Sequence, residues 1–148
     1  MKTTGEMIPF RILIADDDND DIQLTKDCFD ENKLNVKIDE VADGQSLVEL
    51  LRGKGKNYPF KDLPQLILLD LNMPRKSGFE ALAEIKADEN LCKIPIIVFT
   101  TSKAPKDIEK AYQLGANCFV SKPNTLDEWC EKMGKLGRFW MECVKVVN

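Results

Sequence analysis

Hydrophobic and polar positions divide the chain into short apolar runs and longer segments with helical spacing. Continuous or nearly continuous apolar runs, typical of buried strands, occupy residues 11–15, 66–69, 94–99 and 117–121. Residues 36–41 (VKIDEV) carry alternating charges, as an edge strand does. Between the runs, apolar residues recur every three or four positions, which predicts a helix after each strand. Five βα units in succession predict an α/β domain with a parallel sheet covered on both faces.

Local signals mark several helix starts. Asn19 or Asp20 is expected to cap the first helix, because both side chains accept hydrogen bonds from free backbone amides. Ser77 is followed three residues later by Glu80, which is the spacing of a capping box. Pro105 suits the first position of the fourth helix, where its missing N–H would have no partner.

The C-terminal segment continues the helical pattern further than one packed helix needs. Apolar residues recur at helical spacing over residues 126–147, so we expect the last helix to be extended. Gly134 and Gly137 lower the helix propensity of its middle, which leaves open one long helix or two. The apolar face either folds onto the domain's own core or meets a partner. We favour a self-association surface that includes Phe139 and Trp140.

The 148 residues are expected to form one domain. The pattern predicts an N-terminal tail at 1–9, a folded body at 10–135 and a helical extension of the same domain at 136–148. Residues 53–64 (GKGKNYPFKDLP) form an irregular loop, because Gly and Pro interrupt both helical and strand patterns there.

Composition excludes several classes of function. A net charge of −4 argues against non-specific binding to nucleic acid, which needs a basic face. No apolar run reaches the roughly 18 residues of a membrane span, and no signal-peptide core begins the chain, so we expect a cytoplasmic protein without membrane contact. The chain has no histidine, which excludes a Ser-His triad or a phosphohistidine within it.

Five cysteines are spread through the chain without a CxxC pair: Cys28, Cys92, Cys118, Cys130 and Cys143. Their odd number and the predicted cytoplasmic location favour unbridged thiols. A zinc site is not expected, because histidine and paired cysteines are both missing.

Polar residues with chemical potential follow the predicted strands at their carboxyl ends. Asp16 and Asp17 follow the first strand, Asp70 follows the third, and Thr100 and Lys122 follow the fourth and fifth. In a doubly wound parallel sheet these ends lie at one edge, where ligands bind. Residues more than a hundred positions apart are therefore expected to meet in one pocket.

The chemistry of this group points to phosphoryl transfer. Close carboxylates repel each other, and Mg²⁺ relieves the repulsion through oxygen ligands. One carboxylate, Asp70, is then a nucleophile toward phosphorus. Lys122 supplies a positive charge and Thr100 a hydroxyl for the phosphoryl oxygens.

Four stretches carry a resemblance to a known family: ILIADDDND, LILLDLNMPRKSG, IIVFTTS and GANCFVSKP. They resemble the receiver domain of two-component response regulators over residues 10–135. The resemblance implies a flavodoxin-like doubly wound sheet of five parallel strands in the order 2-1-3-4-5, with five helices. It implies Asp70 as phosphoacceptor, and Asp16, Asp17, Asp70 and the carbonyl of Asn72 as ligands of Mg²⁺.

The same resemblance implies a switch. Thr100 is expected to sense the phosphoryl group and Lys122 to pair with it, while Phe119 matches the family's rotating aromatic residue. Phe119 has no hydroxyl, so the switch would be steric. Thr101 stands where many receivers have Ala, and its larger side chain is expected to affect access to the phosphoryl group.

A narrower similarity is to stand-alone receivers of the cyanobacterial phytochrome-response-regulator type. It rests on residues 53–64, the phrase LDLNMPRKSG and the Phe139-Trp140 ending. It implies a single-domain response regulator with a phytochrome-like sensor histidine kinase as partner, and a homodimer. Such a protein assists its own phosphorylation and dephosphorylation and turns over no external metabolite.

A calcium loop is a competing hypothesis, because Asp16, Asp18 and Asp20 alternate as ligands do in an EF-hand. The pattern fails at Asp21, where the loop needs Gly, and at Asp27, where it needs Glu.

Two competing functions are compatible with the predicted α/β fold. An aspartate-nucleophile phosphatase of the haloacid-dehalogenase type would use Asp16 as nucleophile and Asp18 as acid and base, but the chain has little room for a substrate cap. A receiver that signals by protein contact alone would not need to keep Asp70, Thr100 and Lys122.

Overall fold

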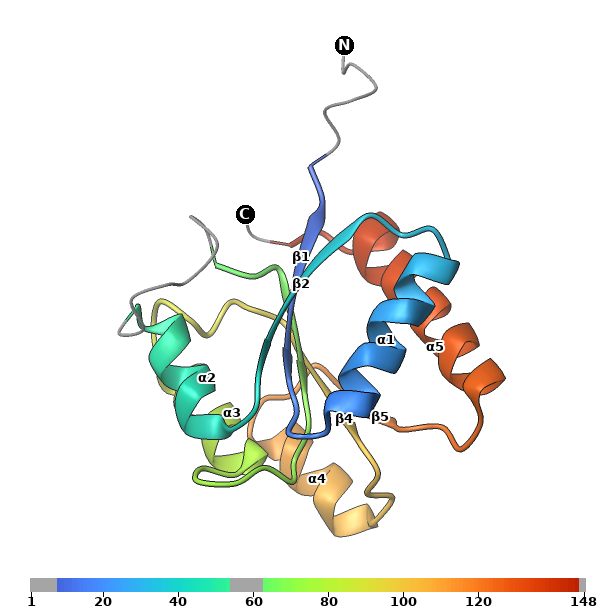
Figure 1. The fold of residues 1–148 in the computed structure, drawn as a ribbon. Coiled ribbons are helices and arrows are strands. Elements are labelled where there is room, and N and C mark those ends of the chain that lie inside the picture. The colour runs from blue at the N-terminus through green and yellow to red at the C-terminus, as the bar shows by residue number, and fades with distance from the viewer. Residues whose placement is uncertain (1–7, 54–62, 147–148) are drawn as a thin grey trace.

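Parallel strands alternate with helices in the computed structural model, which describes residues 8–53 and 63–146. In chain order the elements are β1 (Phe10–Ala15), α1 (Asn19–Glu31), β2 (Val36–Val41), α2 (Gly44–Leu51), β3 (Leu66–Leu69), α3 (Gly78–Ala87), β4 (Ile96–Thr100), α4 (Pro105–Gln113), β5 (Cys118–Ser121), α5 (Leu126–Arg138) and the π-helical turn η1 (Phe139–Cys143) (Figure 1). Residues 54–62 of the loop predicted at 53–64 lie outside the described residues.

The described strands form one parallel sheet in the order β2-β1-β3-β4-β5, as predicted. β3 and β4 are fully buried, because helices cover both faces of the sheet's centre. The register pairs Ala15 of β1 with Leu69 of β3, and Leu69 with Val98 of β4. The residues that follow these strands therefore leave the sheet at one edge.

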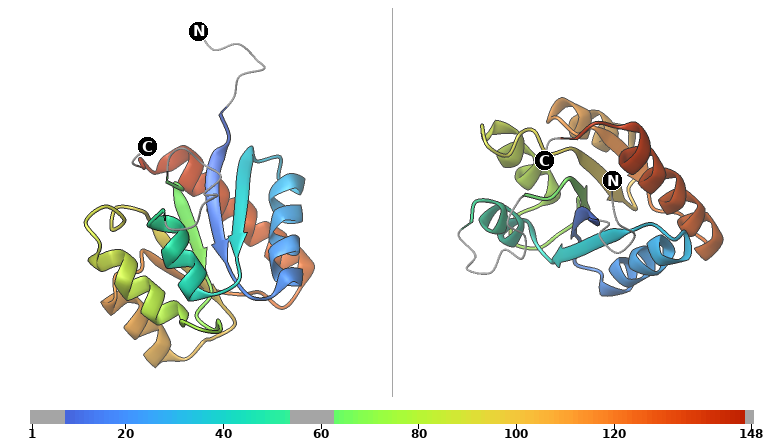
Figure 2. Two further views of the ribbon diagram at one scale, coloured as in Figure 1. Left: turned by 60° about the vertical axis from the view of Figure 1, so that its left-hand side comes forward. Right: turned by 90° about the horizontal axis from the view of Figure 1, so that it is seen from above.

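Two apolar cores fill the space between the sheet and its helices. On one face Leu13, Ile67 and Val98 pack with residues of α2, α3 and α4. On the other face Ile14 and Leu68 pack with α1 and α5. Figure 2 shows α1 and α5 side by side on their face of the sheet. Successive side chains of a strand point to opposite faces of the sheet. Each apolar strand therefore contributes residues to both cores.

The helix caps follow the predictions with one correction. Ser77 and Glu80 form the predicted capping box, and Pro105 opens α4. The cap of α1 is Asp18 and not Asn19 or Asp20, because the Asp18 carboxylate accepts hydrogen bonds from the next free amides, those of Asp20 and Asp21.

α5 runs without a break through Gly134 and Gly137 into η1, so one helical segment extends to Cys143. The helical extension predicted for 136–148 was too long, because residues 144–146 are not helical. Both glycines lie where α1 and the residues after it approach closely. A Cβ at position 134 would lie 2.4 Å from Asn32 Oδ1, and one at position 137 would lie 2.5 Å from Leu34 Cδ1. Close packing, and not a helix break, explains their presence.

The prediction of unbridged thiols was wrong for one pair. Cys28 of α1 and Cys130 of α5 form a disulfide across 102 residues. The two helices pack side by side, and both cysteines lie at their contact, which sequence spacing does not reveal. Cys92, Cys118 and Cys143 are free thiols, as predicted.

Replacing Gly137 with Ala tests this packing. Alanine favours a helix by about 1 kcal/mol over glycine, yet its methyl group would collide with Leu34 and Phe29. We expect the free energy of unfolding in urea to fall by about 1–3 kcal/mol. Lys135→Ala, at an exposed position of the same helix, should change it little. A stabilised Gly137→Ala protein would contradict the close contact.

Candidate functional site

The predicted polar residues meet at the carboxyl edge of the sheet, the lower edge in Figure 1. Asp16, Asp70 and Lys122 follow β1, β3 and β5, and Thr100 is the last residue of β4. All four are buried. Asp17, next to Asp16, is exposed. The structure thus brings together residues that stand up to 106 positions apart.

A buried ion cluster joins three of these residues and adds a fourth. Lys122 Nζ donates hydrogen bonds to Asp16 Oδ2 at 2.7 Å, to Asp21 Oδ2 at 2.7 Å and to Asp70 Oδ2 at 3.2 Å. An ammonium group has three N–H donors, so Lys122 is fully used by three carboxylates. Its side chain is 3% exposed, which leaves little solvent screening.

The pKa values of this cluster reflect burial and pairing. Burial raises the pKa of the Asp16 carboxyl to about 6, against the hydrogen bonds from Lys122 and the Asp18 amide. Burial alone would lower the pKa of Lys122, but its hydrogen bonds to Asp16 and Asp21 and the charge of Asp70 raise it above its usual range. Lys122 is therefore a permanent cation among carboxylates.

Asp21 is the member of the cluster that the sequence pattern did not assign to the site. It lies in the first turn of α1, and α1 directs it toward β5. Helical periodicity could have found it, since Asp21 precedes the buried residues Thr25 and Cys28 by four and seven positions on one face. The sequence pattern used Asp21 only as evidence against a calcium-binding loop, in which that position needs Gly.

A second group of carboxylates suits a metal ion. One carboxylate oxygen each from Asp16, Asp17 and Asp70 lie within 4.8 Å of one another. Asn72 is exposed in the loop after β3, and its amide donates to Asp70 Oδ1 at 3.3 Å. Converging carboxylate oxygens are donors that hard divalent cations prefer, so the residues present fit such an ion.

Thr100 and Phe119 lie on neighbouring strands. The Thr100 carbonyl accepts a hydrogen bond from the Lys122 amide at 2.7 Å, and the Ser102 amide approaches Thr100 Oγ1 at 3.5 Å. Phe119 is partly buried against the core on the α2–α4 face. Its amide donates to the Tyr112 hydroxyl at 3.0 Å, a contact between α4 and β5 that the sequence did not suggest.

Asp18 has a structural task that disfavours the phosphatase and the calcium loop. Its carboxylate caps α1 and accepts from the amides of Asp20 and Asp21. A phosphatase would need Asp18 as acid and base, and a calcium loop would need it as a ligand.

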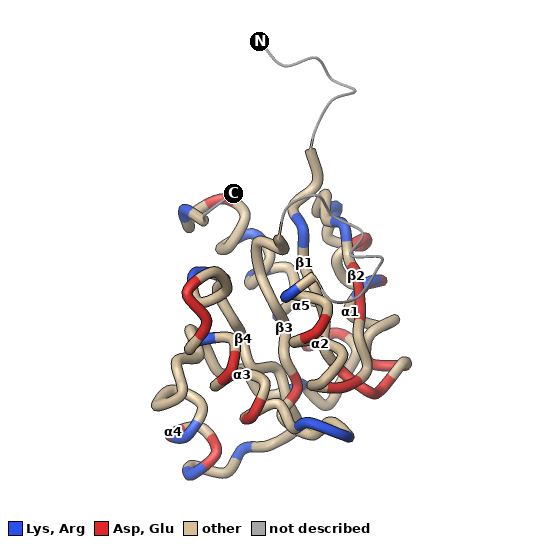
Figure 3. The backbone as a smooth tube through the Cα atoms, turned by 90° about the vertical axis from the view of Figure 1, so that its left-hand side faces the viewer, with Lys and Arg blue, Asp and Glu red and all other residues tan. Residues whose placement is uncertain are grey.

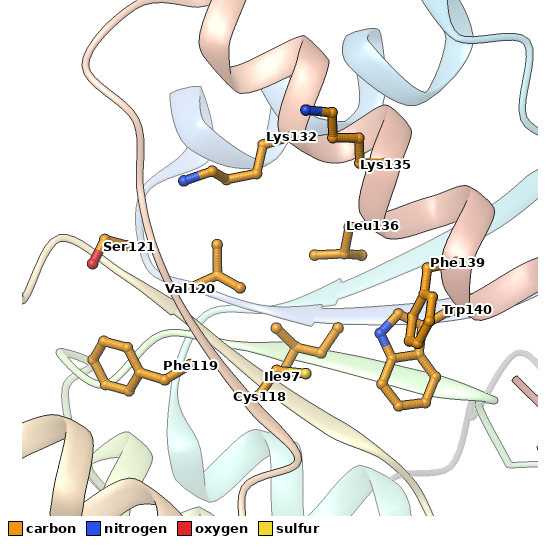
Figure 4. A pocket seen from close by; sticks show the side chains of 10 residues that line it. All are labelled: Ile97, Cys118, Phe119, Val120, Ser121, Lys132, Lys135, Leu136, Phe139 and Trp140. Atoms are coloured by element: carbon orange, nitrogen blue, oxygen red, sulfur yellow. The ribbon is translucent and has the colours of Figure 1, made fainter. Parts of the chain in front are cut away.

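The C-terminal aromatic residues differ in exposure. Phe139 is 53% exposed, whereas Trp140 is 8% exposed and packs against the core on the α1–α5 face. Both line a groove of about 520 Å³ between β5, α5 and η1, together with Cys118, Val120 and Leu136 (Figure 4). Packing onto the chain's own core therefore buries most of the Trp140 side chain. The Phe139 side chain remains exposed at the surface.

In the view of Figure 3, the lysines and arginines of the described residues are spread over several helices and loops, among acidic positions. Among the helices of residues 8–53 and 63–146, none has the length and apolarity of a membrane span.

Comparison with known proteins identifies the family. The response regulator receiver domain matches residues 12–133, and the chain belongs to this family. The resemblance read from the strand-end motifs and the predicted flavodoxin-like fold are confirmed.

Similar proteins include cyanobacterial response regulators. The chain is 34% identical over 136 residues to the response regulator Rcp1 of Synechocystis sp.. The aligned region covers 92% of each sequence. The crystal structure of the phosphorylated cyanobacterial phytochrome response regulator RcpA matches with a TM-score of 0.88 at 33% identity, over 95% of this chain and 100% of that one. The Mn²⁺-bound form of Rcp1 matches with a TM-score of 0.86, with the same identity and coverage.

Replacing Lys122 with Met tests the buried cluster. It would leave three neighbouring carboxylates without their cation, which is expected to cost about 3 kcal/mol of unfolding free energy at pH 7. The loss should grow as the pH rises from about 4 to 7, because raised carboxyl pKa values make the folded chain bind more protons than the unfolded one.

Urea unfolding across this pH range measures the effect. Lys103→Met, which removes an exposed lysine from the loop after β4, is the matched control and should change stability little at any pH. A loss for Lys122→Met that did not vary with pH would contradict the ionic account.

Proposed function

We propose that this chain accepts a phosphoryl group on Asp70 from a phosphohistidine of a sensor histidine kinase, in a reaction that requires Mg²⁺. The observation that carries the proposal is the buried Lys122 ammonium, which bonds to Asp70 beside a group of three carboxylates. Membership of the receiver family and similarity to phosphorylated RcpA support it.

The proposed metal ligands are the carboxylates of Asp16, Asp17 and Asp70 and the backbone carbonyl of Asn72. Mg²⁺ suits this set, because it takes few carboxylates and keeps coordination positions for phosphate oxygens. When bound, it would neutralise the carboxylates and the charge on the transferring group. The related Rcp1 has been solved with Mn²⁺ bound, which supports a divalent ion in this position.

Asp70 would act as the nucleophile. Its ionised carboxylate oxygen forms a bond to phosphorus while the bond from phosphorus to the imidazole nitrogen of the kinase breaks, and the electron pair leaves with the imidazole. Lys122 would then donate to a phosphoryl oxygen, and its bond to Asp21 would keep the ammonium in place as Asp16 turns to the metal. Electrostatic stabilisation of the transferred oxygens is the main contribution of Lys122.

The signal would leave through the surface formed by α4 and β5. Thr100 would move its hydroxyl toward the phosphoryl group, and Phe119 would turn into the space released. The bond from the Phe119 amide to Tyr112 lies between these two elements and would transmit the change. Such a change is a shift between two packings that already exist, driven by the new charge.

Membership of the family and the similar proteins support the proposed partners. A histidine kinase is the phosphodonor, and similarity to cyanobacterial phytochrome response regulators favours a phytochrome-like one. The exposed face of α1 is proposed to contact it in the cytoplasm. The chain acts on its own aspartyl phosphate and on no external metabolite.

We further propose that the chain forms homodimers through the groove between β5, α5 and η1. Phe139 is the exposed aromatic anchor at its rim, and exposed aromatic residues beside apolar grooves are typical of protein interfaces.

Intact mass spectrometry tests the phosphoacceptor. After incubation with Mg²⁺ and acetyl phosphate or phosphoramidate, the wild type should gain one phosphoryl group. EDTA should prevent the gain, and Asp70→Asn should remain unmodified. Asp107→Asn, a change of carboxylate at the start of α4, should behave as the wild type.

Free phosphate is measured in the same samples. A wild type that gained no mass and released no phosphate would contradict the proposal and favour a receiver that signals by contact alone. Sustained hydrolysis of p-nitrophenyl phosphate would favour a phosphatase.

Sedimentation equilibrium tests the dimer. Phe139→Ser should weaken self-association at least about tenfold, because a central aromatic anchor contributes about 2 kcal/mol or more. Leu126→Ser, which removes another exposed apolar side chain from α5, should have little effect. A monomeric wild type, or equal weakening by both changes, would contradict this surface.

A further inference from the structure

One face of α1 carries a row of links to the C-terminal part of the chain. Residues 21, 25 and 28 of α1 follow each other at helical spacing on this face, and Asn32, the C-cap of α1, continues the row. Asp21 binds Lys122, as described above. Thr25 Oγ1 accepts from Trp129 Nε1 at 3.0 Å, and Asn32 Nδ2 donates to the Cys130 carbonyl at 2.9 Å.

The link at the third position of this row is a covalent bond. Cys28 is bonded to Cys130, between the Thr25 and Asn32 links. Cys28 has no exposed surface, whereas Cys130 is only partly buried. The three described free cysteines lie elsewhere on the surface and offer no competing partner in the row. The two sulfurs are therefore paired specifically, and Cys130 is the less buried residue of the pair.

Other contacts hold α1 and α5 together on both sides of the disulfide. Trp129 is buried and contacts Phe99 edge to face at 5.2 Å, and Asn32 also bonds to the Cys28 carbonyl. Arg138 Nη1 approaches Asn32 Oδ1 at 3.4 Å. α1 and α5 would remain packed if the S–S bond opened, but the Asp21 end of the row would lose a rigid neighbour two turns away.

We propose that Cys28 and Cys130 form a reversible thiol–disulfide site, whose redox state sets how firmly α1 holds Lys122 through Asp21. The inference rests on the proposed function for its compartment, because disulfides of cytoplasmic proteins are usually transient and redox-sensing. Its reactants are low-molecular-weight thiols and disulfides of the glutathione class, or a dithiol protein.

The exchange balances in two steps. An external thiolate attacks Sγ of Cys130, the less buried residue of the pair, and the Cys28 thiolate leaves and takes up a proton. A second external thiol then attacks the mixed disulfide, which releases the Cys130 thiol. In total the protein gains two electrons and two protons, and two external thiols become one disulfide. Oxidation is the reverse.

The test equilibrates the full chain in glutathione buffers that span the cytosolic range of redox poise. Alkylation followed by mass spectrometry counts free thiols at Cys28 and Cys130, and ¹⁵N NMR follows the Trp129 indole N–H. We expect both cysteines to titrate together and the Trp129 resonance to shift with them. The reduced protein should be phosphorylated on Asp70 at least about twofold more slowly, because Lys122 is less well positioned.

Two variants make the result specific. Cys130→Ser should show the properties of the reduced protein in every buffer, whereas Cys143→Ser, which removes an exposed free thiol, should titrate as the wild type. A pair that stays oxidised or stays reduced throughout would overturn the proposal. So would titration with an unchanged Trp129 resonance, or with equal or faster phosphorylation after reduction.

Failure of the proposed function is distinguishable. If Asp70 were not phosphorylated in either redox state, the phosphoacceptor role would fall. Paired thiol titration with a shift of the Trp129 resonance would still establish the redox site, and its absence would overturn that site independently.

Discussion

One buried ammonium group organises the functional edge of this protein. Lys122 shares its three donors among Asp16, Asp21 and Asp70, and no other described cation enters that cluster. Three carboxylates brought together at low solvent exposure would repel each other strongly without it. Burial of the cluster is possible because the lysine and the carboxylates neutralise each other's charge. Removal of either partner leaves a buried charge without compensation.

The parallel register of the sheet brings Lys122 and the carboxylates together. Parallel strands end at one edge, so the residues after β1, β3 and β5 come together although they are far apart in sequence. α1 then contributes Asp21 from its first turn, which lies beside the same edge because Asp18 starts the helix there. The disulfide and the hydrogen bonds between α1 and α5 hold this helix against the segment that follows Lys122.

Much of this arrangement was predictable, because it depends on local patterns. The apolar runs predicted the strands. The polar residues at the strand ends, Asp16, Asp70, Thr100 and Lys122, were then predicted to lie together in one site. The part that was not predictable depends on contacts between helices. The Cys28–Cys130 bond follows from the way α1 packs on α5, which no spacing in one sequence encodes.

The same distinction explains the smaller differences. Asp18 and its two neighbours are all good cap residues, and the choice among them depends on where β1 ends. Trp140 and Phe139 are adjacent aromatic residues in one apolar pattern. Trp140 follows the buried Met133 by seven positions and continues the inner face of α5, while Phe139 lies off that face and stays exposed.

On phosphorylation, we propose, Lys122 transfers a hydrogen bond from the carboxylates to the phosphoryl group on Asp70 while it keeps its bond to Asp21. A crystal structure of the chain with Mg²⁺ and beryllofluoride, a stable mimic of the aspartyl phosphate, tests it most directly. We expect Lys122 Nζ to lie about 3 Å from a fluorine atom of the beryllofluoride on Asp70 and about 3 Å from the Asp21 carboxylate. Beryllofluoride bound on Asp70 with Lys122 still bonded to Asp16, or with Asp21 released, would contradict it.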